Sequence, residues 1–211
     1  MAGDPKRRAA HPTARLGRML TTDKAALIAE FTSGSDTRAE AAALEMAAEG
    51  AKSLPLLKEL TAEVNPDARW WATRALAEID DPEVPALLMQ ALTDPDPEVR
   101  YCGAVALRCQ PDEQATASLI QALDSQDRLL ARLAGNALVA IGAAAVPALI
   151  KVMEDGSQVA RLEAARALSE IGDTRTIPVL FKALEEGSVV MEYWASEGLE
   201  KMGVGMTFFE P

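Results

Sequence analysis

Aromatic residues, cysteine and histidine are scarce in this chain of 211 residues. Three Trp, two Tyr and four Phe are the whole aromatic set, and β-branched residues that favour strands are few beside Ala and Leu. The two cysteines, Cys102 and Cys109, are too few for a disulfide framework and favour a reducing compartment. His11 is the only histidine, so neither a zinc site nor a Ser/His/Asp or Cys/His catalytic set is expected in the ordered part.

Long apolar runs are also missing. None approaches the roughly 18 residues that would span a bilayer, and residues 1–20 lack the apolar core of a secretory signal. We therefore expect no membrane insertion and a cytoplasmic protein, unless residues 1–20 are a transit peptide.

The charge is negative and unevenly distributed. The formal net charge is −11, yet residues 1–20 carry five basic side chains and one acidic one. The remainder carries 16 basic and 31 acidic side chains. An acidic surface is poorly suited to nucleic-acid phosphates, so no nucleic-acid partner is expected. The basic head is interpreted as a solvated tail, with a partner-binding arm and a transit peptide as alternatives.

What the chain does contain is a repeat of about 31 residues. One row of leucines recurs at intervals of 32, 31, 31, 30 and 31, and a second row follows in phase. Turn residues separate the rows, so each unit reads as helix, turn, helix, turn. A fixed period of this size predicts an all-α fold, an α-solenoid of about five helical hairpins. The first row is Leu44, Leu76, Leu107, Leu138, Leu168 and Leu199; the second is Leu56, Leu88, Leu119, Leu149 and Leu180.

The same pattern predicts the domain organisation. We expect a flexible basic segment over residues 1–20, the repeat array over residues 21–203, and a capping tail over residues 204–211. The tail carries Met206, Phe208 and Phe209, which could cover the exposed end of the last repeat. Asn65-Pro66 and Asp96-Pro97 are expected to open helices, because Asn and Asp accept free N–H groups and Pro has none. Cys102 and Cys109 are interpreted as buried small residues on one helix face.

The candidate binding residues cluster at the starts of successive first helices. Equivalent positions in stacked units line up, so the arginines should form a row with a gap at Ala131. Arginines beside aromatic rings suit a carboxylate-bearing conjugated ligand or a protein partner. The alternative is structural: an arginine here can pair with an acidic residue of a neighbouring turn, and the aromatics can pack against loops. The candidates are Arg69, Trp70, Trp71, Arg74, Arg100, Tyr101, Arg161, Tyr193 and Trp194.

The repeat itself resembles a known type. The stretches 96–107, 116–123 and 161–184 resemble the HEAT-like repeats of the phycobilin lyase group, of the phycocyanobilin lyase E/F type. Arg69-Trp70-Trp71-Ala72 and Tyr193-Trp194-Ala195 look like the aromatic-rich helix starts of its lyase members. The resemblance covers about residues 36–203. It implies attachment, isomerisation or removal of open-chain tetrapyrroles on phycobilisome antenna proteins, or a part in phycobilisome turnover. It also implies a cyanobacterial-type cytoplasm, or the plastid stroma if residues 1–20 are a transit peptide.

Two functions follow as alternatives. In the first, the chain binds a phycobiliprotein subunit or its bilin, alone or with a second HEAT-like subunit. The arginines would hold propionates of a transient phycocyanobilin-type tetrapyrrole and the tryptophans would stack on it; no tightly bound cofactor and no metal are expected. The catalytic residues stay unassigned, because no self-contained catalytic set is visible, and lyase-like activity is left open. In the second, the chain is a non-enzymatic interaction scaffold without pigment, for example in metal-cluster assembly or signalling.

Overall fold

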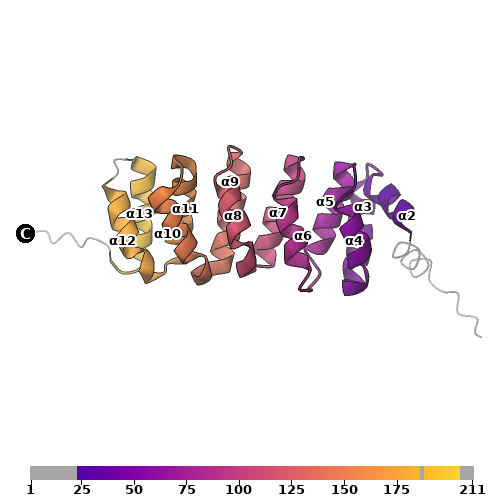
Figure 1. Cartoon of the computed structure of the whole chain (residues 1–211), viewed down its shortest axis with the longest axis horizontal. Coiled ribbons are helices and arrows are strands. Elements are labelled where there is room, and N and C mark those ends of the chain that lie inside the picture. The colour runs from indigo at the N-terminus through magenta and orange to yellow at the C-terminus, as the bar shows by residue number, and fades with distance from the viewer. Residues whose placement is uncertain (1–22, 186–187, 205–211) are drawn as a thin grey trace, which may run out of the picture. The chain divides into compact units, whose positions relative to one another are not determined.

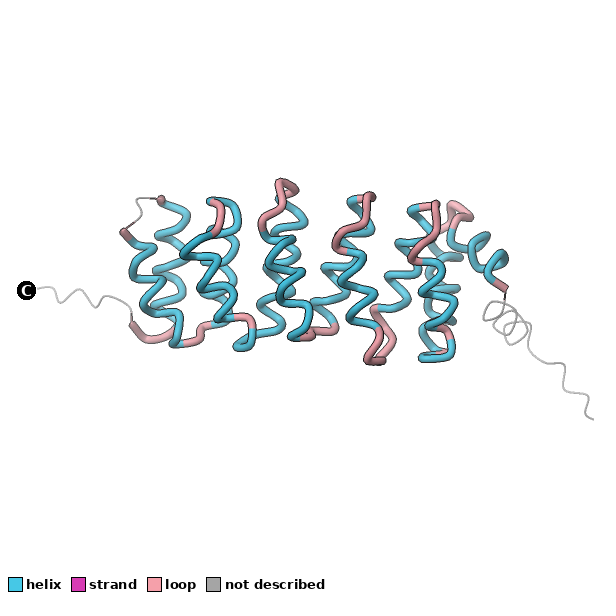
Figure 2. The backbone as a smooth tube through the Cα atoms, in the orientation of Figure 1, coloured by secondary structure: helices cyan, strands magenta, loops and turns pink. Residues whose placement is uncertain are grey.

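The structure is a computed structural model that describes residues 23–185 and 188–204. Within these residues every regular element is a helix, and loops join the helices (Figure 2). The α-solenoid class predicted from the repeat is confirmed. The α-helices are α2 (Lys24–Phe31), α3 (Asp36–Ala48), α4 (Leu54–Leu60), α5 (Pro66–Leu76), α6 (Val84–Ala91), α7 (Pro97–Cys109), α8 (Thr116–Leu123), α9 (Arg128–Ile141), α10 (Val146–Asp155), α11 (Gln158–Ile171), α12 (Ile177–Leu184) and α13 (Val189–Lys201).

The chain divides into two compact units between Asp81 and Pro82. Unit 1 contains α2 to α5, and unit 2 contains α6 to α13. This boundary falls within the predicted repeat array of residues 21–203. That the array forms one domain stays a prediction. The predicted segments 1–20 and 204–211 lie outside the described residues, apart from Val204.

Unit 2 is built from two rows of helices. The longer helices α7, α9, α11 and α13 pack successively against one another, and α8, α10 and α12 do the same more loosely. Each shorter helix also packs against the longer helix that follows it, as Figure 1 shows for α10 with α11 and α12 with α13. Both predicted leucine rows are buried throughout this unit, which confirms them here. In unit 1, α5 packs against α3 and α4, and α2 packs against all three.

The first repeat departs from the predicted leucine rows. Leu44 is 50% exposed and Leu56 is half-buried, whereas Met46 and Leu57 are fully buried. The buried positions of α3 precede their equivalents in α5 by 30 residues, so Met46 occupies the place that Leu76 has in α5. The predicted interval of 32 was therefore wrong, because it followed residue identity instead of the buried face.

Turn chemistry fixes the helix starts. The side chains of Asp23, Asn65, Asp96 and Asp127 each accept backbone N–H groups at the start of the following helix. The predicted openings at Asn65-Pro66 and Asp96-Pro97 are confirmed. At the opposite ends, Gly142 and Gly172 adopt positive φ angles of 73° and 67°, which end α9 and α11 without a Cβ clash.

The cysteines differ in burial. Cys102 is buried and Cys109 is exposed, so the prediction that both are buried was wrong for Cys109. Cys109 is the last residue of α7, and the equivalent positions at the ends of α9 and α11 are exposed as well. Both cysteines lie on α7, but only Cys102 is covered by neighbouring residues. Within the described residues, no group of three or more His, Cys, Asp or Glu is placed to hold a metal ion.

A buried arginine joins α9 and α11. Arg166 is only 1% exposed, and its Nε lies 2.9 Å from the Oε2 of Glu163, while its Nη1 lies 2.5 Å from the Oε1 of Glu170. Its Nη2 donates to the backbone carbonyl of Arg132 on α9 at 3.3 Å. Gly135 makes room for it, because a Cβ there would lie 2.6 Å from that nitrogen. A buried cation is tolerated when it is paired and hydrogen-bonded in this way.

Candidate functional site

Two arginines of the predicted row, Arg69 and Arg100, share one local geometry. The Nη1 of Arg69 donates to the backbone carbonyls of Glu63 and Val64, both at 2.9 Å. The Nη1 of Arg100 donates to those of Asp94 and Pro95, at 2.8 and 3.1 Å. Both arginines therefore fasten the turn that precedes their own helix.

Arg161 makes a related contact, since its Nε donates at 2.9 Å to the carbonyl of Met153 in the last turn of α10. Carbonyls at and beyond a helix end lack intrahelical donors, and a cation satisfies them well. The equivalent position of α9 is occupied by Ala131, which is buried and leaves the predicted gap in the row of arginines.

Arg100 also belongs to a link between repeats. The hydroxyl of Tyr101 donates to the Oδ2 of Asp127 at 2.6 Å, and the Nη2 of Arg100 lies 3.7 Å from the same oxygen. Asp127 in turn accepts from the backbone N–H of Leu129 and Leu130 at the start of α9. The hydrogen bond from Tyr101, helped by these N–H groups and by Arg100, lowers the pKa of Asp127, and the same bond raises the pKa of Tyr101. The expected pairing of an arginine with a neighbouring turn is thus present at Arg100.

The tryptophans of unit 1 pack on each other and on the N-terminal helix. The rings of Trp71 and Phe31 stack at 6.4 Å, and Phe31 is itself buried. Trp70 meets Trp71 edge to face at 4.6 Å. Both tryptophans are half-buried, so Trp71 holds α2 against α5. On the same helix, Arg74 forms a surface ion pair with Glu78 at 2.7 Å.

The aromatic pair of α13 is more open. Tyr193 is 56% exposed, and its ring meets that of Trp194 edge to face at 4.9 Å. Of the nine predicted residues, four lie in unit 1 and five in unit 2. In unit 2 they lie within the first two turns of α7, α11 and α13, near the helix starts.

A row of apolar side chains also lies on the first turns of α9, α11 and α13. Leu129 and Val190 are 51% and 50% exposed and occupy equivalent positions, with half-buried Val159 between them. Leu162 and Tyr193 stand three residues further along α11 and α13, on the same helix faces. Because α9, α11 and α13 pack in succession, these residues form one surface, here called the apolar stripe: Leu129, Val159, Leu162, Val190 and Tyr193.

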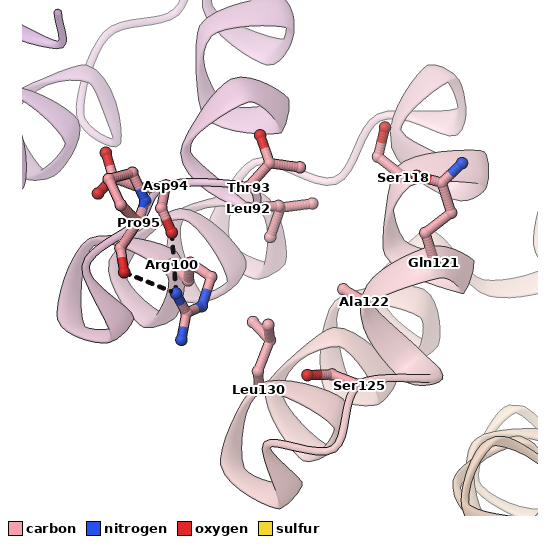
Figure 3. A pocket seen from close by; sticks show the side chains of 10 residues that line it. All are labelled: Leu92, Thr93, Asp94, Pro95, Arg100, Ser118, Gln121, Ala122, Ser125 and Leu130. Carbon is pink, nitrogen blue, oxygen red and sulfur yellow. Dashed lines mark hydrogen bonds between the residues drawn. The ribbon is translucent and has the colours of Figure 1, made fainter.

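A groove of about 510 Å³ lies elsewhere in unit 2 (Figure 3). One wall is the turn of residues 92–95 with Arg100 of α7, and the other is α8 with the following turn and Leu130. Sequence reasoning found Arg100 but missed Ser118 and Gln121 of α8. Leu129, Val159 and Val190 of the stripe were missed too, although their recurrence at intervals of 30 and 31 residues is visible in the sequence.

The comparisons with known proteins bear on the repeat type. The family model for HEAT repeats matches residues 25–108, 53–138 and 116–200, which together span most of the chain. The chain belongs to the HEAT-repeat family. No curated protein matches the sequence of this HEAT-repeat protein.

Several solved structures are similar to it. A chain of the complex of CpcE and CpcF of phycocyanin lyase from Nostoc sp. PCC7120 is 22% identical, with a TM-score of 0.54, and the match covers 68% of this chain and 96% of that chain. YibA from Escherichia coli is 17% identical, with a TM-score of 0.54 and coverage of 93% and 77%. A designed armadillo repeat protein in complex with the peptide (KR)4 is 18% identical, with a TM-score of 0.50 and coverage of 89% and 98%. At these identities the likeness shows a shared helical-repeat fold.

None of the helices in the described ranges has the length and apolar character needed to cross a membrane.

Proposed function

We propose that this HEAT-repeat protein is an interaction scaffold and that unit 2 binds a partner protein on the apolar stripe. The observation that carries the proposal is the exposure of Leu129 on α9 and of Val190 and Tyr193 on α13, each at least half exposed, with the half-buried Val159 and Leu162 of α11 between them. Apolar side chains gathered on one surface are typical of protein interaction sites. HEAT and armadillo repeats generally present such surfaces to other proteins.

The packing beneath the stripe suits binding. Leu138, Leu168 and Leu199, on the same three helices, are buried in the core. Their packing fixes the helices before a partner arrives, so little conformational entropy is lost on binding. The tyrosine ring supplies a large, stiff contact with a polar tip, a residue type enriched at interfaces. The partner chemistry that fits is an apolar protein surface with a polar rim.

Charge substitutions on the stripe test the scaffold function. Leu129→Glu and Tyr193→Glu are expected to remove the partner that co-purifies with the wild-type protein from its native cells, because each buries a carboxylate in an apolar interface. Val105→Glu is the matched control, since Val105 is also exposed (39%) but lies on α7 outside the stripe. The readout is the set of proteins recovered with each variant, after circular dichroism shows equal helicity.

The partner must be lost with both stripe variants and kept with the control. Recovery of the same proteins with all three variants would place binding elsewhere, and recovery of no specific protein with the wild type would contradict the scaffold function.

A second candidate function is chromophore handling on phycobiliproteins. It is supported by the likeness to the chain from the phycocyanin lyase complex and by the ring pair of the exposed Tyr193 and the half-buried Trp194 at the end of the stripe. In this function the protein would position a phycobiliprotein subunit or its bilin, alone or with a second HEAT-like subunit. Arg69, Arg100 and Arg161 already donate hydrogen bonds to backbone carbonyls. The bilin propionates would therefore bind more exposed cations such as Arg132, whose side chain is 47% exposed.

Pigment titration tests this second function. Phycocyanobilin added at micromolar concentration is expected to quench tryptophan fluorescence and to shift its own absorption band. Tyr193→Ala should weaken binding by about tenfold, because it removes the ring that stacks on the pigment. Phe181→Ala, which removes another exposed aromatic ring (43%) on α12, should leave affinity unchanged. Absence of any spectral change would exclude the pigment while leaving the scaffold function intact.

A further inference from the structure

The groove between the turn of residues 92–95 and α8 has a floor and a rim of different chemistry. Leu92, Ala122 and Leu130 line it and are almost fully buried, so the floor is apolar. Its volume of about 510 Å³ lies within the usual range of binding sites for small ligands or side chains. In Figure 3 the side chains of Ser118 and Gln121 on α8 stand opposite the turn that carries Thr93 and Asp94.

The rim offers donors and acceptors suited to a polypeptide main chain. Gln121 is exposed on α8, and its side-chain amide can both donate and accept, as a peptide group requires. Ser118, one turn earlier, adds a hydroxyl. Thr93 and Ser125 are less available, because Thr93 donates to the carbonyl of Gln90 and Ser125 accepts from the N–H of Asp127. The binding edge is therefore the α8 side.

Arg100 does not make the groove a carboxylate site. Figure 3 shows its Nη1 bonded to the carbonyls of Asp94 and Pro95, and its Nη2 lies near the carboxylate of Asp127. The charge of Arg100 is thus already met within the protein. An incoming acid would have to displace Asp127 from this arrangement and would meet further carboxylates nearby.

The two stretches of chain that flank the groove carry more acidic than basic side chains. Residues 92–100 and 121–130 together hold the acidic Asp94, Asp96, Glu98, Asp124 and Asp127 and the basic Arg100 and Arg128. A cationic ligand is favoured there by charge complementarity. Long basic side chains also match the floor, because their methylene stems can lie on apolar surface while the charged head stays at the rim.

We propose that this groove binds an extended segment of a partner polypeptide that carries lysine or arginine. The main chain pairs with Ser118 and Gln121, a basic side chain lies over Leu92, Ala122 and Leu130, and its charged head reaches the acidic rim at Asp94. The site is separate from the apolar stripe, so it exists whether or not the stripe binds a partner.

Peptide binding measured by fluorescence anisotropy tests the site. The probe is a labelled peptide of alternating lysine and threonine, about eight residues long, compared with peptides in which glutamate or serine replaces lysine. The lysine peptide is expected to bind the full chain more tightly than the other two, and addition of salt should weaken it.

Two variants locate the binding. Gln121→Lys should weaken the lysine peptide by about tenfold or more, because it sets a like charge at the rim. Gln114→Lys makes the same change in charge beside the start of α8, at the helix end away from the groove, and should alter affinity by less than about twofold. Ser118→Phe fills the groove without changing charge and should also abolish binding.

Four results would overturn the proposal: no binding of the lysine peptide, equal binding of the serine peptide, tighter binding of the glutamate peptide, or equal effects of Gln121→Lys and Gln114→Lys. A fifth concerns the basic residues of the chain's own N-terminal segment. If replacing Lys6, Arg7 and Arg8 with glutamine strengthens peptide binding by about tenfold, the groove is occupied by that segment and not by a partner. Every one of these results leaves the stripe experiment unaffected.

Discussion

Arg166→Leu is expected to lower the free energy of unfolding by about 3–5 kcal/mol, because it breaks a buried ion network. The substitution leaves Glu163, whose side chain is 17% exposed, without its closest cation. It also removes the hydrogen bond to the Arg132 carbonyl and the guanidinium group that occupies the space beside Gly135. The measurement is chemical denaturation followed by far-ultraviolet circular dichroism.

Arg74→Leu is the matched control for this loss. Arg74 stands at the repeat position equivalent to Arg166 and pairs with Glu78 four residues later, as Arg166 pairs with Glu170. Its side chain is 33% exposed and that of Glu78 is 50% exposed, so removing the pair should cost about 0.5 kcal/mol or less. Equal losses from the two substitutions would mean that Arg166 is as solvated as Arg74, contrary to the packing of α9 on α11.

Met46→Ala is expected to destabilise the protein by about 2–5 kcal/mol, since it leaves a cavity where α3 meets its neighbours. Leu44→Ala, two residues earlier on the same helix, removes a side chain that is half exposed and should cost about 0.5 kcal/mol or less. The pair tests which face of α3 is buried, and both values come from the denaturation midpoint at a constant slope.

The opposite order would restore the leucine row that the sequence suggested. In that case Leu44 would occupy the core position, and the 30-residue relation between α3 and α5 would be wrong.

Most of the fold could be predicted from the sequence because each repeat must bury the same positions against its neighbours. Leu107, Leu138 and Leu168 must all be buried where their helices pack, and a period of about 31 residues shows this without coordinates. The prediction failed at α3, where alanines and Met46 form the buried face. Leu44 falls close to the expected interval but lies on the exposed side of the helix. A row based on residue identity cannot distinguish a leucine in the core from one on the surface.

The candidate site was predicted only in outline. The equivalence of Arg69, Arg100 and Arg161 follows from the repeat, but their partners are backbone carbonyls, which leave no mark in the sequence. The groove could not be predicted from the sequence, for a different reason. Its lining comes from separate stretches of chain, and Ser118 and Gln121 look like ordinary surface residues until α8 is placed opposite the turn of residues 92–95.

Hydroxyl-radical footprinting with and without the co-purified partner tests the stripe most directly, because it reports the solvent exposure of individual side chains. Oxidation of Tyr193, Leu129 and Val190 is predicted to fall when the partner is added. Phe181 and Val105, exposed apolar side chains outside the stripe, should react as before. Unchanged oxidation of Tyr193 and Leu129 in the complex would contradict the account.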